Sequence, residues 1–216
     1  MNKSSKSNEK DAVDRLSFER RLWDESYNRV MGLDEVGRGC LSGPVVAAGV
    51  IFEPDTFVKE IRDSKTVGLE ERRELTKKIK ETAAYWTIQW CMPSEIDELN
   101  ILHASIKAMN KCAEAAGATP DYLLVDGNRF SSGLCPHKCI VGGDDRSMSI
   151  AAASIIAKVY RDEWMIDLHE EYPHYSWDTN VGYPTAQHYE GLEEHGATKW
   201  HRQSFNLRTD EMIDAD

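Results

Sequence analysis

The sequence predicts an α/β fold, in which strands and helices alternate around one sheet. The first observation is a strongly strand-like apolar run at residues 45–52, VVAAGVIF. The second is a pair of helical stretches of different character, one charged at residues 69–82 and one rich in alanine near the start of residues 149–171. The third is that 216 residues with 41% hydrophobic content suit one packed core rather than two.

The domain organisation follows from composition. A single globular domain is expected over residues 13–207. It follows a tail at residues 1–12 that is rich in Lys, Ser, Asn and Glu, and it precedes an acidic tail at residues 208–216.

The first two strands are expected at residues 30–35 and 45–52, as an antiparallel pair joined by a glycine-rich turn. A short helix or irregular lead at residues 13–31 precedes them. The later elements are expected in this order: helix 69–82, strand 83–92, helix 94–116 with Ser94 as its N-cap, strand 121–125, strand 138–141, helix 149–171 and helix 186–194.

Charge and cysteine content restrict the classes of protein. No apolar run approaches the roughly 18 residues that span a bilayer, and the N-terminus lacks the apolar core of a secretory signal, so a soluble cytoplasmic protein is expected. Five cysteines suit reduced thiols, and Cys135 and Cys139 lack the second ligand pair of a zinc site. The net charge of −11 counts against a nucleic-acid binder unless the acids lie in a metal site or away from substrate. A monomer is expected, and no protein partner can be identified.

Two adjacent acids, Asp34 and Glu35, end the first predicted strand and precede glycines at positions 37, 39 and 43. Neighbouring carboxylates that lose hydration repel one another unless a cation holds them. Arg38, carried between two glycines, is a planar donor suited to phosphate. Strict alternation along a strand points the two acids to opposite faces, so a shared metal centre predicts a bend or bulge there.

Two further acids, Asp126 and Asp144, also follow predicted strands. Ligand sites of open α/β sheets lie beyond strand ends, so the four acids are expected to converge. Oxygen-only ligands favour Mg²⁺ or Mn²⁺, and two such ions about 4 Å apart suit phosphodiester cleavage. The alternative is that Asp126 and Asp144 are ordinary turn and cap residues.

Seven segments together resemble the ribonuclease HII family. They occur in the family's order from about residue 28 to residue 206: GLDEVGRGCLSGPVVAAGVIF, DSK at 63–65, NILHASIKAM from 100, LLVDGN, SIAAASIIAKVYRDEWM, GYPT from 182 and HRQSF from 201. The resemblance implies an RNase H-like mixed β-sheet flanked by helices, with a mainly helical C-terminal part. It also implies an endonuclease that cuts the RNA strand of RNA-DNA hybrids and cuts 5′ to ribonucleotides embedded in duplex DNA, leaving 3′-hydroxyl and 5′-phosphate ends.

The resemblance also implies roles for individual residues. Those at metal-binding and catalytic positions of the family are Asp34, Glu35, Asp126 and Asp144. Those at substrate-binding positions are Gly37, Arg38 and Gly39, which match the turn that senses a 2′-hydroxyl, and Tyr183, which matches the aromatic that stacks on the neighbouring deoxyribose. Basic positions for phosphate contact or site support are Lys65, Lys158 and Arg161, although Lys158 and Arg161 also have acidic neighbours with which to pair.

The chain departs from the family pattern at two lysine positions, now Gly142 and Val181, and Asp145 leaves open which of Asp144 and Asp145 is the fourth acid. Three rival interpretations are a ribonuclease HIII, a catalytically silent hybrid-binding module and a phosphoesterase acting on small molecules. The first usually has a longer N-terminal part and a glycine-lysine-glycine turn. The second requires the loss of an acid, and the third leaves the turn and Tyr183 unexplained. The choice between Mg²⁺ and Mn²⁺ in the cell, the preference for long hybrids or single ribonucleotides and the existence of a sliding-clamp partner stay open.

Overall fold

The computed structural model describes residues 14–63 and 68–208 and contains one five-stranded sheet in the order β3-β2-β1-β4-β5. The central strand β1 pairs antiparallel with β2 and parallel with β4, and β4 pairs parallel with β5. The predicted mixed sheet and the predicted antiparallel pair are therefore confirmed. The predicted N-terminal tail and nearly all of the C-terminal tail lie outside the described residues.

The elements follow the predicted order closely. The strands are β1 Val30–Val36, β2 Val45–Ile51, β3 Tyr85–Cys91, β4 Tyr122–Asp126 and β5 His137–Ile140. The helices are α1 Ser17–Asp24, α2 Leu69–Thr82, α3 Pro93–Leu99, α4 Ile101–Ala113, α5 Met148–Glu171, α6 Trp177–Asn180 and α7 Ala186–His195, with short 3₁₀ turns η1 Lys59–Asp63, η2 Gly143–Asp145 and η3 Pro173–Tyr175. Within the described residues no helix is long and apolar enough to span a membrane.

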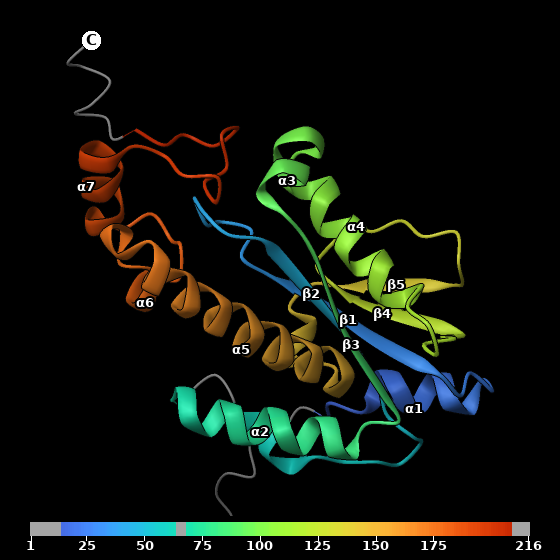
Figure 1. The fold of residues 1–216 in the computed structure, drawn as a ribbon. Helices are drawn as coiled ribbons and strands as arrows, with labels where there is room; N and C mark the ends of the chain where they lie inside the picture. The colour runs from blue at the N-terminus through green and yellow to red at the C-terminus, as the bar shows by residue number, and fades with distance from the viewer. Residues whose placement is uncertain (1–13, 64–67, 209–216) are drawn as a thin grey trace, which may run out of the picture.

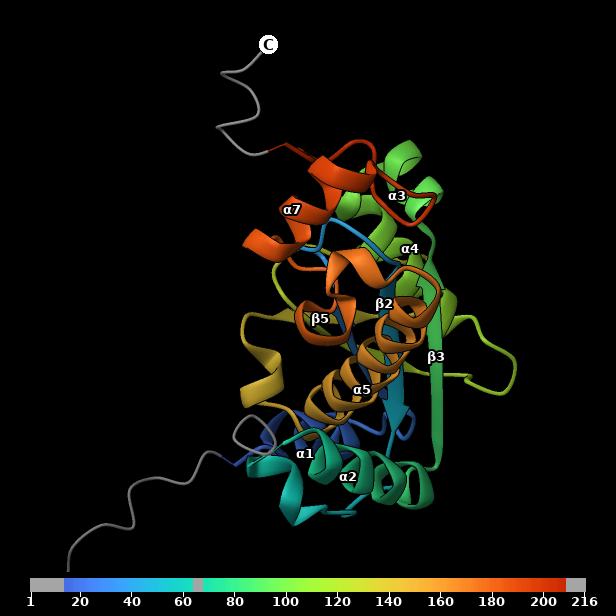
Figure 2. The same cartoon turned by 60° about the vertical axis from the view of Figure 1, so that its left-hand side comes forward.

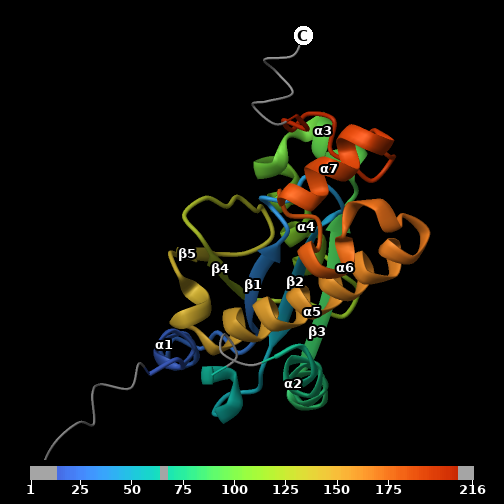
Figure 3. The same ribbon diagram turned by 90° about the vertical axis from the view of Figure 1, so that its left-hand side faces the viewer.

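Helices cover both faces of the sheet, as Figures 1 and 2 show. The long helix α5 packs on one face against β1 and β2, while α4 packs on the other face against β2 and β3. Both faces of β2 are consequently buried, which explains why its sequence is apolar throughout rather than alternating. The C-terminal part beyond α5 is mainly helical, as predicted, and Figure 3 shows α6 and α7 beyond the end of α5.

Gly32 of β1 is in close contact with the start of α5. A Cβ atom at this position would lie 2.2 Å from the Ser149 carbonyl carbon and 2.3 Å from the Ile150 nitrogen. Both neighbours are backbone atoms, which cannot rotate away as a side chain does. The small residues at the start of α5 thus allow the helix to lie directly on the central strand.

We expect Gly32→Ala to lower the free energy of unfolding by about 3 kcal/mol or more, because the clash separates α5 from β1. The matched control is Gly133→Ala, since a Cβ atom there has no neighbour within 4 Å. That control should change stability by less than about 0.5 kcal/mol. Urea unfolding of both variants measures the difference, and equal stabilities would contradict the close approach.

The single helix expected at residues 94–116 is instead two helices, and this expectation was wrong. Asn100 interrupts the helix, because its backbone has φ 65° and ψ 163°. Its Oδ1 accepts hydrogen bonds from Leu102 N and His103 N. Asn100 therefore acts as the N-cap of α4. Ser94 is not a cap either, because α3 begins one residue earlier at Pro93. A single asparagine with a positive φ leaves the apolar spacing on both sides intact, so periodicity alone did not reveal the break.

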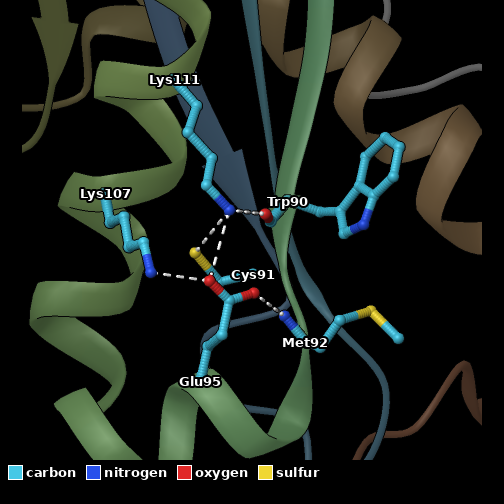
Figure 4. A network of polar contacts seen from close by, with 6 residues as sticks. All are labelled: Trp90, Cys91, Met92, Glu95, Lys107 and Lys111. Atoms are coloured by element: carbon cyan, nitrogen blue, oxygen red, sulfur yellow. Dashed lines mark hydrogen bonds and ion pairs between the residues drawn. The ribbon is translucent and has the colours of Figure 1, made fainter.

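The start of α3 is fastened to α4 by Glu95, as Figure 4 shows. Its Oε1 lies 2.7 Å from Lys107 Nζ and 3.3 Å from Lys111 Nζ, and its Oε2 accepts a hydrogen bond from Met92 N. Burial opposes the charged form, but the two lysines and the Met92 amide outweigh it and lower the pKa of Glu95 to about 2. Lys111 Nζ also donates to Trp90 O at the end of β3. This network sets the position of α4 against the sheet.

Candidate active site

The four predicted acids come from neighbouring elements at one edge of the sheet. Asp34 and Glu35 lie near the end of β1, and Asp126 ends the adjacent parallel strand β4. Asp144 lies in η2, which follows β5. Gly143 N donates to Asp126 Oδ1 at 2.6 Å and so holds η2 against the end of β4.

Burial and mutual repulsion raise the pKa of three of these acids. Asp34 is 7% exposed, and burial raises its pKa well above the usual value; the Ser154 hydrogen bond lowers it, whereas the charges of Glu35 and Asp126 raise it. Burial likewise raises the pKa of Glu35 against the opposing effect of Arg38. Burial and the Asp144 charge raise the pKa of Asp126. A cation among these carboxylates would relieve this repulsion.

The bend or bulge expected at Asp34 and Glu35 is absent. β1 keeps its regular pairing with β2 through both acids, with Asp34 opposite Ala48 and Glu35 opposite Ala47. The two side chains therefore diverge as strand geometry requires. Asp34 bonds to Ser154 on α5, and Glu35 Oε1 lies 3.0 Å from Arg38 Nη1.

No group of three or more His, Cys, Asp or Glu side chains within residues 14–63 and 68–208 is arranged ready to hold a metal ion. Asp34 accepts a hydrogen bond from Glu35 N, Glu35 from Arg38 and Asp126 from Gly143 N. The donor set consists of carboxylate oxygens alone, which fits Mg²⁺ or Mn²⁺. The four acids, linked by their mutual charges, are the residues that would hold such ions.

Asp144 and Asp145 differ in their surroundings. Asp145 has a side chain that is 56% exposed, and its Oδ1 lies 3.8 Å from Arg15 Nη2. Asp144 is half-buried, and its charge acts on Asp126. This arrangement favours Asp144 as the fourth acid.

The glycine-rich turn after β1 is held from inside by Arg202, a residue that sequence reasoning missed. Arg202 is fully buried, and its guanidinium donates to the carbonyls of Gly37, Arg38 and Gly43 at 2.7–3.1 Å. Burial and the nearby charge of Arg161 lower the pKa of Arg202 to about 9, so it stays a cation at neutral pH. The only sequence signal was its place in the HRQSF segment.

Two of the three basic residues predicted from the family, Arg161 and Lys158, have different surroundings, and the third is not described. Arg161 is fully buried and donates to the carbonyls of Pro44, Ser42 and Val181, which is an arrangement for site support. Lys158 Nζ lies 2.6 Å from Asp162 Oδ1, which is the local pairing that the sequence left open. Lys65 lies outside the described residues.

Tyr183 lies beside the glycine-rich turn. Gly182, just before it, accepts a hydrogen bond from Leu41 N at 2.8 Å, which joins the two loops. A Cβ atom on Gly39 would lie 3.8 Å from Tyr183 Cε1, and the tyrosine is 41% exposed. The structure thus brings together the turn and the aromatic that the sequence assigned to one binding site.

A buried pair of histidines, His188 and His201, supports the loop that carries Tyr183. His188 Nδ1 lies 2.9 Å from Tyr183 O, so it donates its proton there, and its Nε2 accepts from Trp177 Nε1. His201 Nδ1 accepts from Thr198 N, so its Nε2 carries the proton toward His188 Nε2 at 3.1 Å. Every ring nitrogen of the two histidines therefore has a hydrogen-bond partner when both rings are neutral. A further proton on either ring would face another donor.

This network predicts a loss of stability in mild acid. Burial lowers the pKa of His188, and burial with the nearby His188 lowers the pKa of His201 to about 3, against 6.5 for an ordinary histidine. Because the unfolded chain takes up these protons first, the stabilising contribution is complete above pH 6.5 and is lost as the pH falls toward 3. We expect His201→Asn to flatten the fall in unfolding free energy between pH 6.5 and 5. His103→Asn, at an exposed position, is the matched control in urea titrations, and a slope for His201→Asn identical to that of the unmodified protein would refute the neutral pair.

Comparison with known proteins finds matches along most of the chain. The family model described as Ribonuclease HII matches residues 31–208. Ribonuclease HII of Salinibacter ruber is 52% identical over 199 residues, covering 90% of this chain and all of that protein.

Two solved structures share the fold. Ribonuclease H2 from Pyrococcus horikoshii OT3 superposes with a TM-score of 0.74 at 22% identity, covering 82% of this chain and 94% of its own. Bst-RNase HIII, solved in complex with Mn²⁺, superposes with a TM-score of 0.63 at 19% identity, covering 86% of this chain and 69% of its own. At these identities the likeness concerns the fold alone.

Proposed function

The chain belongs to the ribonuclease HII family and is a divalent-metal-dependent ribonuclease H, and from that membership we propose its substrate and mechanism. The proposed substrates are RNA-DNA hybrids and duplex DNA that contains single ribonucleotides. Cleavage occurs 5′ to the ribonucleotide and leaves 3′-hydroxyl and 5′-phosphate ends. Two Mg²⁺ or Mn²⁺ ions assist the reaction.

The observation that carries this proposal is the set of acids at the ends of β1 and β4 and within η2, whose charges act on one another in a largely buried region. Asp34, Glu35, Asp126 and Asp144 would hold the ions. When bound, two divalent ions stabilise the attacking and leaving oxygens of a phosphodiester. The raised pKa values of Asp34, Glu35 and Asp126 are those expected of carboxylates whose charges a bound cation would stabilise.

The chain's own residues supply the recognition of ribose. The carbonyls of Gly37 and Arg38 are taken by Arg202, whereas the N–H groups of Arg38 and Gly39 have no acceptor among the described residues. These amides are free to bind the 2′-hydroxyl that distinguishes ribose from deoxyribose. Tyr183, half-exposed beside the turn, would stack on the next sugar. Arg38, which has a half-exposed side chain paired to Glu35, would contact a phosphate.

The experiment is cleavage of a labelled DNA duplex that contains one ribonucleotide, with Mg²⁺, with Mn²⁺ and with chelator. An all-DNA duplex and a long RNA-DNA hybrid are cut in parallel. Metal-dependent cutting only 5′ to the ribonucleotide supports the proposal. Cutting of long hybrids alone would overturn the junction role of the turn and Tyr183, and cutting of neither substrate would overturn the activity.

The fourth acid can be identified by separate substitutions. We expect Asp144→Asn to reduce cleavage more than about 100-fold, since residues that only orient metal ligands already cost roughly 10–100-fold when they are lost. Asp145→Asn should reduce it less than about threefold, because that side chain is exposed and points toward Arg15. Both variants are compared at saturating Mn²⁺. The reverse order would make Asp145 the ligand.

A further inference from the structure

A pocket of about 230 Å³ opens beside the acids on the α4 side of the sheet. Glu35 and Asp126 form one wall, so the pocket is continuous with the candidate metal site. The opposite wall is apolar and comes from α4, through Leu102, Ile106 and Met109. Ligand pockets commonly combine an apolar wall with a few polar groups in this way.

Two polar groups at this pocket have no partner. Ser105 also lines it, is 1% exposed and has an Oγ with no hydrogen bond within the described part of the chain. A buried hydroxyl without a partner is costly, which points to a group that completes it. At the rim Arg129 is exposed, and no described residue pairs with its guanidinium. Asn128 stands next to it with an exposed amide.

The pocket and the Tyr183 loop lie on different sides of the acids. The loop is tied to the α5 side, because Arg161 of α5 donates to Val181 O. The pocket is walled by α4, which lies on the opposite face of the sheet, as Figure 1 shows. A nucleic-acid strand bound from Tyr183 across the acids would then reach the pocket.

We propose that this pocket binds the nucleotide immediately 5′ to the scissile phosphate, in the strand that is cut. The inference rests on the proposed function, which places the ribonucleotide at the glycine-rich turn on the 3′ side of that phosphate. The α4 side chains contact the sugar and the base, and Ser105 Oγ gains a hydrogen bond with the base. Arg129 binds the phosphate on the 5′ side of this nucleotide. The volume lies below the range of roughly 300–1,000 Å³ that encloses drug-sized ligands, so it suits a single nucleoside.

The test measures equilibrium binding in chelator, so that it does not depend on cleavage. The duplex carries one ribonucleotide, and a methylphosphonate removes the charge of one phosphate at a time around it. Arg129→Gln should weaken binding to the unmodified duplex about tenfold, as expected for one lost charged contact. That loss should vanish only when the methylphosphonate replaces the phosphate that Arg129 is proposed to bind, which is the next phosphate on the 5′ side of the scissile one.

Arg21→Gln is the matched control, because Arg21 is an exposed arginine on α1 and the overall charge changes equally. Equal losses for Arg129→Gln and Arg21→Gln, or a loss that vanishes at a phosphate 3′ of the ribonucleotide or in the other strand, would overturn the assignment.

A second variant, Ser105→Ala, tests the interior of the pocket. It should weaken binding about threefold with a normal nucleotide at the 5′ position and leave binding unchanged when that nucleotide is abasic. An equal effect on both duplexes would count against the pocket. Cleavage by the unmodified protein with Mn²⁺ is measured separately, so a failure of the proposed function is distinguishable from a failure of the pocket.

Discussion

Asp34→Asn should abolish metal-dependent cleavage, with a loss of more than about 100-fold, while the fold stays intact. Asp34 is the most deeply buried of the three acids whose pKa is raised, and burial raises its pKa because the charged form has lost its hydration. A carboxylate with a raised pKa destabilises the folded state above the ordinary pKa of aspartate. The asparagine variant should therefore be at least as stable as the unmodified protein at pH 7.

The measurement combines cleavage rates at saturating Mn²⁺ with urea unfolding at pH 7 and pH 4. The stability difference between the two proteins should shrink as the pH falls, because Asp34 then takes up a proton in the folded state. Asp24→Asn, at an exposed position on α1, controls for the loss of one charge. Near-normal cleavage by Asp34→Asn would refute the metal-binding role of this residue.

Arg202→Ala should lower the free energy of unfolding by about 3–5 kcal/mol, since it leaves buried polar groups without partners. The lost guanidinium serves the carbonyls of Gly37, Arg38 and Gly43, which point into the interior. Arg202→Lys should recover little of the loss. An ammonium is a point donor on a flexible stem and does not reproduce the planar fork that spans three carbonyls.

The control for Arg202 is Arg20→Ala, which removes an arginine from an exposed ion pair with Asp14. Exposed pairs contribute about 0–1 kcal/mol, so this variant should unfold almost normally in urea. For any Arg202 variant that still folds, selectivity for a single ribonucleotide over a long hybrid should fall, because the turn has lost its internal support. Full recovery of stability by lysine would contradict the geometric argument.

The positions of strands and helices followed from local patterns. The run VVAAGVI was recognisable as a strand because each of its residues is apolar and most are branched or small, and α2 was placed at its observed bounds by its charged, helix-favouring composition. These signals act between residues that are close in sequence. The break at Asn100 was missed because its cause is the backbone conformation of one residue, which leaves the hydrophobic spacing unchanged.

The candidate acids were likewise recognisable, because Asp34, Glu35 and Asp126 lie at the ends of strands, and these strand ends meet at one edge of the sheet. The expected bulge was wrong, since pairing with β2 continues through both acids. Which acid faces which helix depends on where α4 and α5 pack, and a motif does not contain that information.

The support of the site depends on contacts between distant parts of the chain. Arg202 lies 165 residues from Gly37 along the chain, and Arg161 lies 119 residues from Ser42. Arg202 nevertheless donates a hydrogen bond to Gly37 O, and Arg161 donates one to Ser42 O. The amino-acid pattern near each residue specifies its element and its chemical type, because those depend on neighbours within a few positions. Its partner, its burial and the shift in its pKa arise only when the sheet and helices have packed and water is excluded, and for that reason they are properties of the folded chain.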